Sequence, residues 1–401
     1  MMEKNRNSKK RRIGFIVGMF ILLMLAFTGG RLSASIKTPL EEGFDNDAIL
    51  SKVKRLEAYI NTFYLDDIDS DKVTDGVYHG LVSGLGDPYS EYYTKQEYQD
   101  MMDSDAGEYR GIGIIVYKES QSGYVVIESV MKDQPAYNAG IQNGDIMISV
   151  DGVNTTEMTL SETVAKIKRG EADTVKLTIL RNNQTLDVEV DKKNIVVESV
   201  EWEMKENNIG YISVAQFIEN TDEHFITAVD ELEKQGMKGL IIDLRDNGGG
   251  LVDTCINMVS RIIPENDLIV SIKDKNEKTE EYKCKDARTL DMPIVILANE
   301  NTASASEIMT GCLKDYGLVT VIGGKTFGKG IVQNVMPLGD GSAIKLTVAA
   351  YYTPKGTSIH KQGIEPDIDM AYKPEEWLKI RKGEKKDTQM EKAISVLKEK
   401  Q

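Results

Sequence analysis

Two short apolar runs in the second half of this 401-residue chain constrain its fold most, because each is bounded by polar residues and followed by a helical pattern. They are Gly239–Leu244 and Pro293–Ala298. A strand that is covered on both faces of its sheet has an almost uninterrupted apolar sequence. Alternation of such strands with helices is typical of a layered α/β sheet. Together with a strand at Ile209–Val214 and a helix at Thr221–Gln235, they predict an α/β core over residues 194–373.

The residues before this core form two further regions. Over residues 46–105 the apolar side chains recur at helical spacing, and Gly84–Tyr89 interrupts them as a tight turn. Over residues 106–193 short β-type runs alternate with Asn-Gly and Asp-Gly turn signals, with one amphipathic helix at about Leu160–Lys168. We expect a helical region and a small β domain of about ninety residues. The charged tail, residues 374–401, is expected to be a helical extension.

The N-terminus carries a membrane signal. Six basic residues within positions 4–12 precede an uncharged apolar run from Ile13 to Gly30, closed by Arg31. We therefore predict a transmembrane anchor over residues 1–31, followed by a linker over 32–45. The basic flank would stay in the cytoplasm, so this single-pass protein of the cell membrane would hold its folded part outside. A cleaved signal peptide is the competing interpretation, because small residues follow the run. Either way the folded part is exported.

Composition excludes several function classes. The net charge of -15 argues against a nucleic-acid partner, since phosphate binding needs a basic surface. Cys255, Cys284 and Cys312 are widely spaced, lack a C-x-x-C pair, and are expected to be buried free thiols. Only His79 and two other histidines occur, with no H-E-x-x-H zinc motif. We expect no metal and no cofactor, and a Ser/His/Asp hydrolase fits poorly.

Three segments of the α/β core combine residues that carry chemistry. The first, Asn301–Ile308, follows a buried strand and opens a helix, so backbone N–H groups around Ser304 can hold an oxyanion. Ser304 and Glu307 also fit a capping box, S-x-x-E, which needs no catalysis. The second segment, Thr326–Gln333, brings Lys329 between two glycines into a loop before an extended stretch.

A lysine can act as a base only if desolvation lowers its pKa. If the chain is extended from Lys329, then Gln333 points to the same face and could orient the amine. A solvated lysine in a glycine turn is the ordinary alternative, and the spacing of a phosphate-binding loop is absent. The third segment, Asp243–Gly250, ends a buried strand in three glycines that can expose N–H groups to a carbonyl oxygen. Taken alone, this segment is better explained as an ordinary strand-to-helix loop.

In order and spacing, the three segments resemble the carboxyl-terminal processing proteases, also called tail-specific proteases, and the likeness extends from Leu85–Ser90 to Pro366–Asp367. The resemblance implies a serine endopeptidase with Ser304 as nucleophile, Lys329 as general base and Gln333 as the glutamine of the site.

The same resemblance assigns the oxyanion donors to Gly249 or Gly250 and to the N–H of Ala305, without deciding between the glycines. Ser306 is the rival nucleophile, disfavoured only by its spacing to Lys329. The β domain resembles a PDZ domain, a module that binds protein C-termini. Its carboxylate-binding loop would comprise four residues, which are Gly111, Ile112, Gly113 and Ile114.

In this interpretation the PDZ domain captures a protein C-terminus by β-augmentation and feeds it to the Ser/Lys site. Leu160, Val164 and Ile167 line the peptide groove or, alternatively, pack in the domain core. A membrane-tethered PDZ adaptor with an inactive protease-like domain is the non-enzymatic alternative. The resemblance also suggests a homodimer formed by the helical N-terminal region and the C-terminal helix, with packing inside one chain as the competing explanation.

Overall fold

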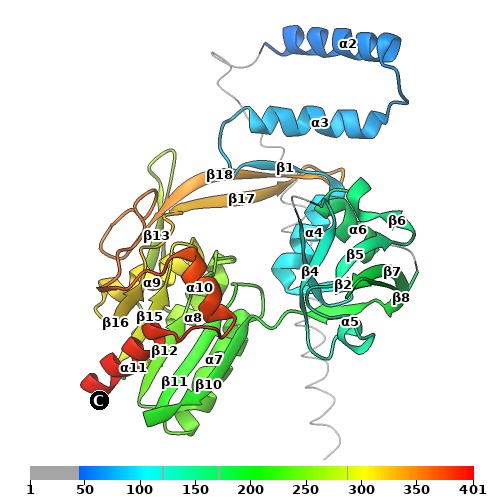
Figure 1. The fold of residues 1–401 in the computed structure, drawn as a ribbon. Coiled ribbons are helices and arrows are strands. Elements are labelled where there is room, and N and C mark those ends of the chain that lie inside the picture. The colour runs from blue at the N-terminus through cyan, green and yellow to red at the C-terminus, as the bar shows by residue number, and fades with distance from the viewer. Residues whose placement is uncertain (1–44, 120–121, 170–171, 287) are drawn as a thin grey trace, which may run out of the picture. The chain divides into compact units, whose positions relative to one another are not determined.

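A computed structural model of the chain describes residues 45–119, 122–169, 172–286 and 288–401 (Figure 1). The chain divides into two compact units, Met1–Thr74 and Asp75–Gln401, which are taken separately below. The predicted membrane anchor at residues 1–31 and the linker to residue 44 lie outside the described residues. In the described part of the chain no helix is long and apolar enough to cross a membrane.

The first unit contains α2 (Asn46–Phe63) and the beginning of α3 (Ser70–Ser83). Asp45 caps α2 by accepting a hydrogen bond from the backbone N–H of Ala48 at 3.0 Å. The apolar side chains of α2 remain exposed, to 53% for Leu50 and 76% for Phe63. The helical region predicted for residues 46–105 is therefore present here, with an apolar face left uncovered.

The second unit opens with the end of α3, a turn, a strand and a helix. The predicted turn forms, with Gly86 at φ +67°. The helical region predicted over residues 46–105 is wrong at one point, because Glu91–Tyr93 forms strand β1. Its tyrosines are buried and the strand pairs with β18 (Ala343–Tyr352). Helix α4 (Lys95–Ala106) then starts at a Thr94–Glu97 capping box.

The small β domain has a five-stranded path in the order β3-β4-β5-β7-β8, with a short β6 beside β5 and a separate β2–β9 pair. Its strands are β2 (Glu108–Gly111), β3 (Ile114–Lys118), β4 (Val125–Val130), β5 (Ile146–Val150), β6 (Val153–Asn154), β7 (Thr174–Arg181), β8 (Gln184–Asp191) and β9 (Lys193–Val196). Helices α5 (Pro135–Asn138) and α6 (Leu160–Arg169) complete it. Strands β2 and β3 are separated at Ile112 and Gly113, and Gly113 adopts φ +77°.

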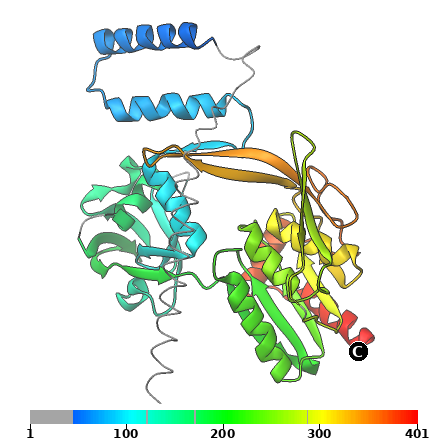
Figure 2. The same ribbon diagram turned by 180° about the vertical axis from the view of Figure 1, so that it is seen from behind.

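The α/β core is built on a six-stranded sheet in the order β10-β11-β12-β15-β16-β19 (Figures 1 and 2). Its strands are β10 (Val200–Lys205), β11 (Ile209–Val214), β12 (Gly239–Asp243), β15 (Ile294–Ala298), β16 (Val319–Gly323) and β19 (Ile368–Asp369). All neighbours pair in parallel except β10 and β11. Ile209–Val214 was predicted to the residue, and the two apolar runs form β12 and β15.

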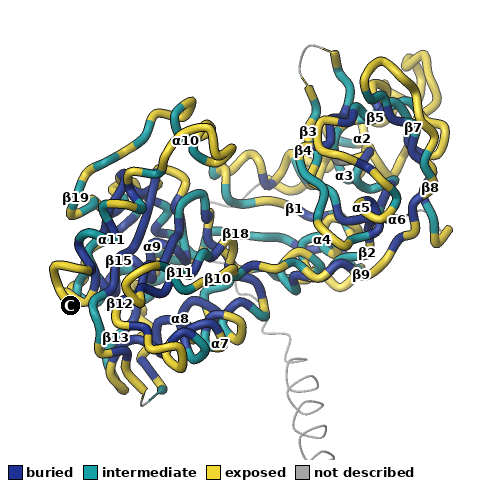
Figure 3. The backbone as a smooth tube through the Cα atoms, turned by 60° about the horizontal axis from the view of Figure 1, so that its bottom comes forward, coloured by how far each residue is buried: buried dark blue, intermediate teal, exposed yellow. Residues whose placement is uncertain are grey.

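Helices cover both faces of this sheet, which explains why its central strands are largely apolar. One face packs against α7 (Thr221–Lys234), α8 (Val252–Ser260) and α9 (Ala305–Asp315). The opposite face packs against α11 (Thr388–Lys400). The central strands are accordingly buried along their length (Figure 3). The three cysteines are buried free thiols, as predicted.

A second sheet, not predicted from the sequence, joins β1, β18, β13 (Leu268–Asp274) and β14 (Thr279–Lys283) in that order, and β17 (Ile331–Pro337) pairs with β18. Strand β17 begins two residues after Lys329, so the loop with the predicted base leads directly into this sheet.

The C-terminal extension forms α10 (Pro374–Arg381) and α11. The apolar face of α11, with Ala393, Val396 and Leu397, packs on the sheet of its own chain. Packing within one chain, the competing explanation for this helix, therefore accounts for the apolar face of α11.

Candidate active site

Ser304 lies at a sharp turn between strand β15 and helix α9. Its backbone adopts φ +57° and ψ -119°, a left-handed conformation that non-glycine residues rarely take. Such strain persists only where the surrounding structure enforces it, and it concentrates at functional sites. The side chain is half-buried, and the next residue is the first of α9, whose N-terminal N–H groups have no partner within the helix. This turn presents the hydroxyl beside a set of hydrogen-bond donors.

Glu307 ties the Ser304 turn to the Lys329 loop. Its carboxylate is fully buried, and Oε2 accepts from the backbone N–H of Ser304 at 3.0 Å and of Lys329 at 2.8 Å. The other oxygen accepts from the hydroxyl of Thr326 at 2.6 Å and from the N–H of Gly328 at 2.8 Å. The residue that the sequence marks as a helix cap therefore also binds a loop about twenty positions downstream, and one oxygen atom joins the backbones of Ser304 and Lys329.

The amine of Lys329 lies over the ring of Tyr89, with Nζ 4.7 Å from the ring centre. Burial lowers the pKa of Lys329 below its ordinary value, and the nearby charge of Lys345 adds to this, while Asp87 opposes it. Both main causes favour the neutral amine that a general base needs. Within the described residues, no hydrogen bond joins this amine to the Ser304 hydroxyl. The structure thus brings the two backbones together and leaves the amine on the tyrosine ring.

Tyr351 fixes the loop from the other side. Its hydroxyl donates to the carbonyl oxygen of Lys329. Burial, and then the charge of Glu307, raise the pKa of Tyr351 well above its ordinary value, so the phenol stays a neutral donor. Sequence inspection missed Tyr351, because it lies on β18 in no recognisable motif.

Gln333 makes no hydrogen bond to Lys329 in the described part of the chain. The pairing of β17 with β18 shifts between Val332 and Gln333, where Val348 of β18 has no partner residue on β17. Lys329 itself precedes β17, so the shared face of Lys329 and Gln333 stays a prediction. The amide of Gln333 makes only long hydrogen bonds, to the carbonyl of Ile331 at 3.4 Å and the hydroxyl of Thr347 at 3.5 Å. These bonds are too long to hold the Gln333 side chain firmly.

Ser306, the rival nucleophile, has a different environment. It is completely buried, and its hydroxyl donates to the carbonyl oxygen of Asn247 at 3.0 Å. The backbone N–H of Ala303 donates to the same oxygen, also at 3.0 Å. Ser306 therefore links α9 to the segment Asp243–Gly250, called the glycine loop below. Its hydroxyl is already used in the hydrogen bond to Asn247.

The glycine loop lies directly against Ser304. A Cβ built on Gly249, whose φ is +101°, would come within 2.7 Å of the Ser304 Cβ and 2.9 Å of the Ala305 nitrogen, so only glycine fits. The N–H of Gly249 donates to the side chain of Asn247 at 2.8 Å. In the described part of the chain no hydrogen bond uses the N–H of Gly250 or of Ala305. Both donors are therefore available to a ligand.

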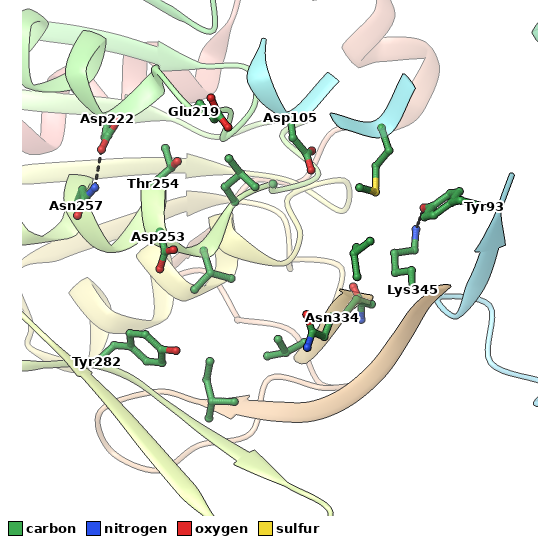
Figure 4. A pocket seen from close by; sticks show the side chains of 18 residues that line it. Tyr93, Asp105, Glu219, Asp222, Asp253, Thr254, Asn257, Tyr282, Asn334 and Lys345 are labelled. Atoms are coloured by element: carbon green, nitrogen blue, oxygen red, sulfur yellow. Dashed lines mark hydrogen bonds between the residues drawn. The ribbon is translucent and has the colours of Figure 1, made fainter. Parts of the chain in front are cut away.

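A cavity of about 840 Å³ extends from this loop (Figure 4). Gly250 and the start of α8 form one side, Gln333 and its neighbours on β17 another, and Tyr93 and Asp105 a third. Sequence inspection gave no sign of this cavity, because its walls come from segments that lie far apart in the sequence.

In the small β domain, the four residues of the predicted carboxylate-binding loop border one groove. Gly111, Ile112, Gly113 and Ile114 line it together with Val164, Ile167 and others. Leu160 packs against the domain core, the alternative that the sequence left open, and Ile167 belongs to that core as well as to the groove lining. Strand β3 is at the edge of its sheet, so its outer side is open to a further strand.

Comparison with known families assigns three segments of the chain. Residues 208–370 match the model of peptidase family S41, residues 100–180 match the PDZ domain, and residues 18–97 match the N-terminal domain of the activating protease CtpB. These segments correspond to the α/β core, the small β domain and the N-terminal region.

Individual relatives agree. A CtpA-like serine protease from Staphylococcus haemolyticus is 36% identical over 380 residues, covering 92% of this chain and 76% of the relative. The carboxy-terminal processing protease CtpA of Bacillus subtilis is 38% identical over 323 residues, covering 80% and 69%. Among solved structures, the photosystem II D1 C-terminal processing protease is 29% identical with a TM-score of 0.50, covering 80% of this chain and 87% of that one.

Proposed function

This chain belongs to the C-terminal processing serine proteases of peptidase family S41, and from that premise we propose that it cleaves peptide bonds with a dyad of Ser304 and Lys329. Lys329 in its neutral form removes the proton of the Ser304 hydroxyl, which attacks the peptide carbonyl and forms an acyl-enzyme. The protonated amine then returns the proton to the leaving amine, and water completes hydrolysis. The strained, half-buried position of Ser304 is the observation that carries this assignment.

Three properties of the site support the dyad. Glu307 holds the backbones of both residues on one oxygen atom, which keeps the Lys329 loop beside the Ser304 turn. Burial lowers the pKa of Lys329, as a lysine base requires. The position of the amine over Tyr89 then describes a resting state, since the face of an aromatic ring attracts a cation. In the competent state the amine leaves the ring for Ser304.

Gln333 is proposed to orient the amine in that competent state. Its present hydrogen bonds are at the long end of the range, so little opposes its rotation toward Lys329. For the oxyanion we propose the N–H groups of Gly250 and Ala305. Gly249 is less suited as a donor because Asn247 already binds its N–H, and its role is to leave room against Ser304.

Substrate capture is proposed to occur at the PDZ domain. A protein C-terminus would add to the open edge of β3, with its carboxylate on the N–H groups of the loop from Gly111 to Ile114. The apolar side chains of Val164 and Ile167 in the groove favour an apolar terminal residue. The captured chain would reach Ser304 through the cavity beside Gly250.

We further propose that residues 1–31 anchor the protein in the cell membrane with the protease outside, on the strength of the basic flank and the apolar run. A homodimer is proposed to form through the exposed apolar face of α2. Sedimentation of the fragment beginning at Leu32 tests the dimer, and a monomer at micromolar concentration would contradict it.

Digestion of casein or a labelled tail peptide tests the catalytic proposal. The wild-type fragment should cleave, while Ser304→Ala and Lys329→Ala should each abolish cleavage and keep the wild-type circular dichroism spectrum. Cleavage that survives Ser304→Ala would refute the assignment, and a wild-type fragment without activity would favour a peptide-binding adaptor.

A further inference from the structure

Asp246 lies four residues before Gly250 and is bonded to the turn that carries Ser304. Its Oδ1 accepts from the side-chain amides of Asn299 at 2.8 Å and Asn301 at 2.9 Å. Its own N–H donates to the side-chain oxygen of Asn299 at 3.0 Å. The glycine loop and the serine turn are thus joined at a point outside the catalytic residues.

The second oxygen of Asp246 binds the C-terminal extension. Oδ2 accepts from the indole Nε1 of Trp377 on α10 at 2.7 Å, and Arg381 lies 3.5 Å away. Burial would raise the pKa of Asp246, but hydrogen bonds from Asn301, Asn299 and Trp377 outweigh it, so the pKa lies below its ordinary value and the group is ionised at neutral pH. Charge-assisted bonds of this kind are among the stronger ones in proteins.

The neighbouring Arg245 is held by the same extension. Its side chain is 4% exposed and forms ion pairs with Asp243 at 2.5 Å and Asp387 at 2.8 Å. It also donates to Gln389 at 2.9 Å, and its guanidinium lies 4.5 Å from the ring centre of Trp377. Two consecutive residues of the glycine loop are therefore fixed by α10 and by the start of α11.

We propose that Trp377 and Asp246 are positioning residues through which the C-terminal extension holds the Gly250 N–H in place to receive the oxyanion formed at Ser304. The inference rests on the proposed function. Neither side chain touches the substrate. They act because the loop between Asp246 and Gly250 is short, so a shift at one end moves the donor at the other.

The magnitude follows from the chemistry of such donors. Complete loss of an oxyanion donor costs about 10²–10³ in kcat. Loosening a donor that remains present should cost less, roughly tenfold, and the loss should fall on kcat because the donor acts in the transition state.

Trp377→Phe in the full-length, detergent-solubilised protein tests this, because phenylalanine keeps a ring and removes the N–H. We expect kcat to fall about tenfold with KM within twofold and an unchanged pH profile. A peptide boronate forms a tetrahedral adduct with an oxygen in the oxyanion position, so its inhibition constant should rise by the same factor as kcat falls. The chain's other tryptophan provides the matched control, since Trp202 is 40% exposed on β10 and Trp202→Phe should change none of these values.

If Trp377→Phe loses activity but its inhibition constant for the boronate is unchanged, the loss reflects a smaller fraction of folded protein, and the proposal is overturned. Full activity of Trp377→Phe would overturn it as well. Asp246→Asn provides a second variant, because its amide nitrogen cannot accept a hydrogen bond, and the same pattern is expected. Hydrogen exchange is independent of catalysis, and the amides of residues 246–250 should exchange faster in Trp377→Phe. If the wild-type protein neither cleaves nor binds the boronate, the proposed function fails, while unchanged exchange in Trp377→Phe refutes the coupling itself.

Discussion

Replacing Glu307 by glutamine is the most informative single perturbation of the site. The substitution keeps the side chain's shape and removes its charge and one acceptor oxygen. Each carboxylate oxygen of Glu307 accepts two hydrogen bonds. In glutamine one of these oxygens is replaced by an NH₂ group, which cannot accept a hydrogen bond from either donor. The fully buried location leaves no water to replace the lost bonds.

The expected cost can be worked out from these contacts. Hydrogen bonds to a charged group contribute about 1.5–3 kcal/mol each, so losing two costs about 3–6 kcal/mol. A domain has only about 5–15 kcal/mol of stability in total, so Glu307→Gln should destabilise the α/β core severely. Even where the core stays folded, the Lys329 loop is released from the Ser304 turn, and kcat should fall at least tenfold, about the effect of a misplaced catalytic group.

Urea unfolding and peptide cleavage, measured on the same preparation, test this prediction. Glu300→Gln is the matched control, because Glu300 is an exposed residue on the same turn. It should change the free energy of unfolding by no more than about 0.5 kcal/mol and leave cleavage intact. The reasoning fails if Glu307→Gln unfolds at the same urea concentration as the control and cleaves at the same rate.

Three other predictions concern the base, the glycine loop and the tail. Burial lowers the pKa of Lys329, and only the neutral amine accepts a proton, so kcat/KM should drop as pH falls through that pKa. Lys329→Arg should be inactive at every pH, and a flat pH profile of the wild-type protein down to acid would contradict the lysine base. Gly249→Ala should abolish cleavage because the new methyl group collides with the serine turn, whereas Gly248→Ala should be active because the space around Gly248 is open. Comparable cleavage rates for the two variants would refute the packing argument. Leu397→Ala should lower the free energy of unfolding by about 2–5 kcal/mol, and Leu378→Ala by far less, because Leu378 is 50% exposed. Equal urea midpoints for the two variants would show that α11 does not pack on the sheet.

The sequence predicts the parts of this fold that depend on local patterns. Strand β11 and the buried strands β12 and β15 follow from apolar runs that only a sheet covered on both faces explains. The second sheet could not be predicted, because its strands alternate irregularly and its pairings are distant, as between Glu91 and Lys345. Strand β1 was hidden for the same reason within a helical pattern.

The site shows the same division. Motif and spacing single out Ser304 and Lys329, and a capping pattern points to Glu307. The contacts of the Glu307 carboxylate with a loop beyond its own helix depend on the tertiary fold, and so does the link from Asp246 to Trp377 across 131 positions. The hydrogen bonds of the Gln333 amide likewise depend on how β17 pairs with β18, which no local pattern of the sequence predicts.

Covalent labelling at Ser304 tests the central claim most directly. The protein is treated with a fluorophosphonate across a range of pH, and the modified residue is identified by peptide mass spectrometry. The account predicts one adduct, on Ser304, forming more slowly as pH falls and absent in Lys329→Ala. An adduct on Ser306, or labelling of Ser304 at an unchanged rate without the lysine, would contradict it.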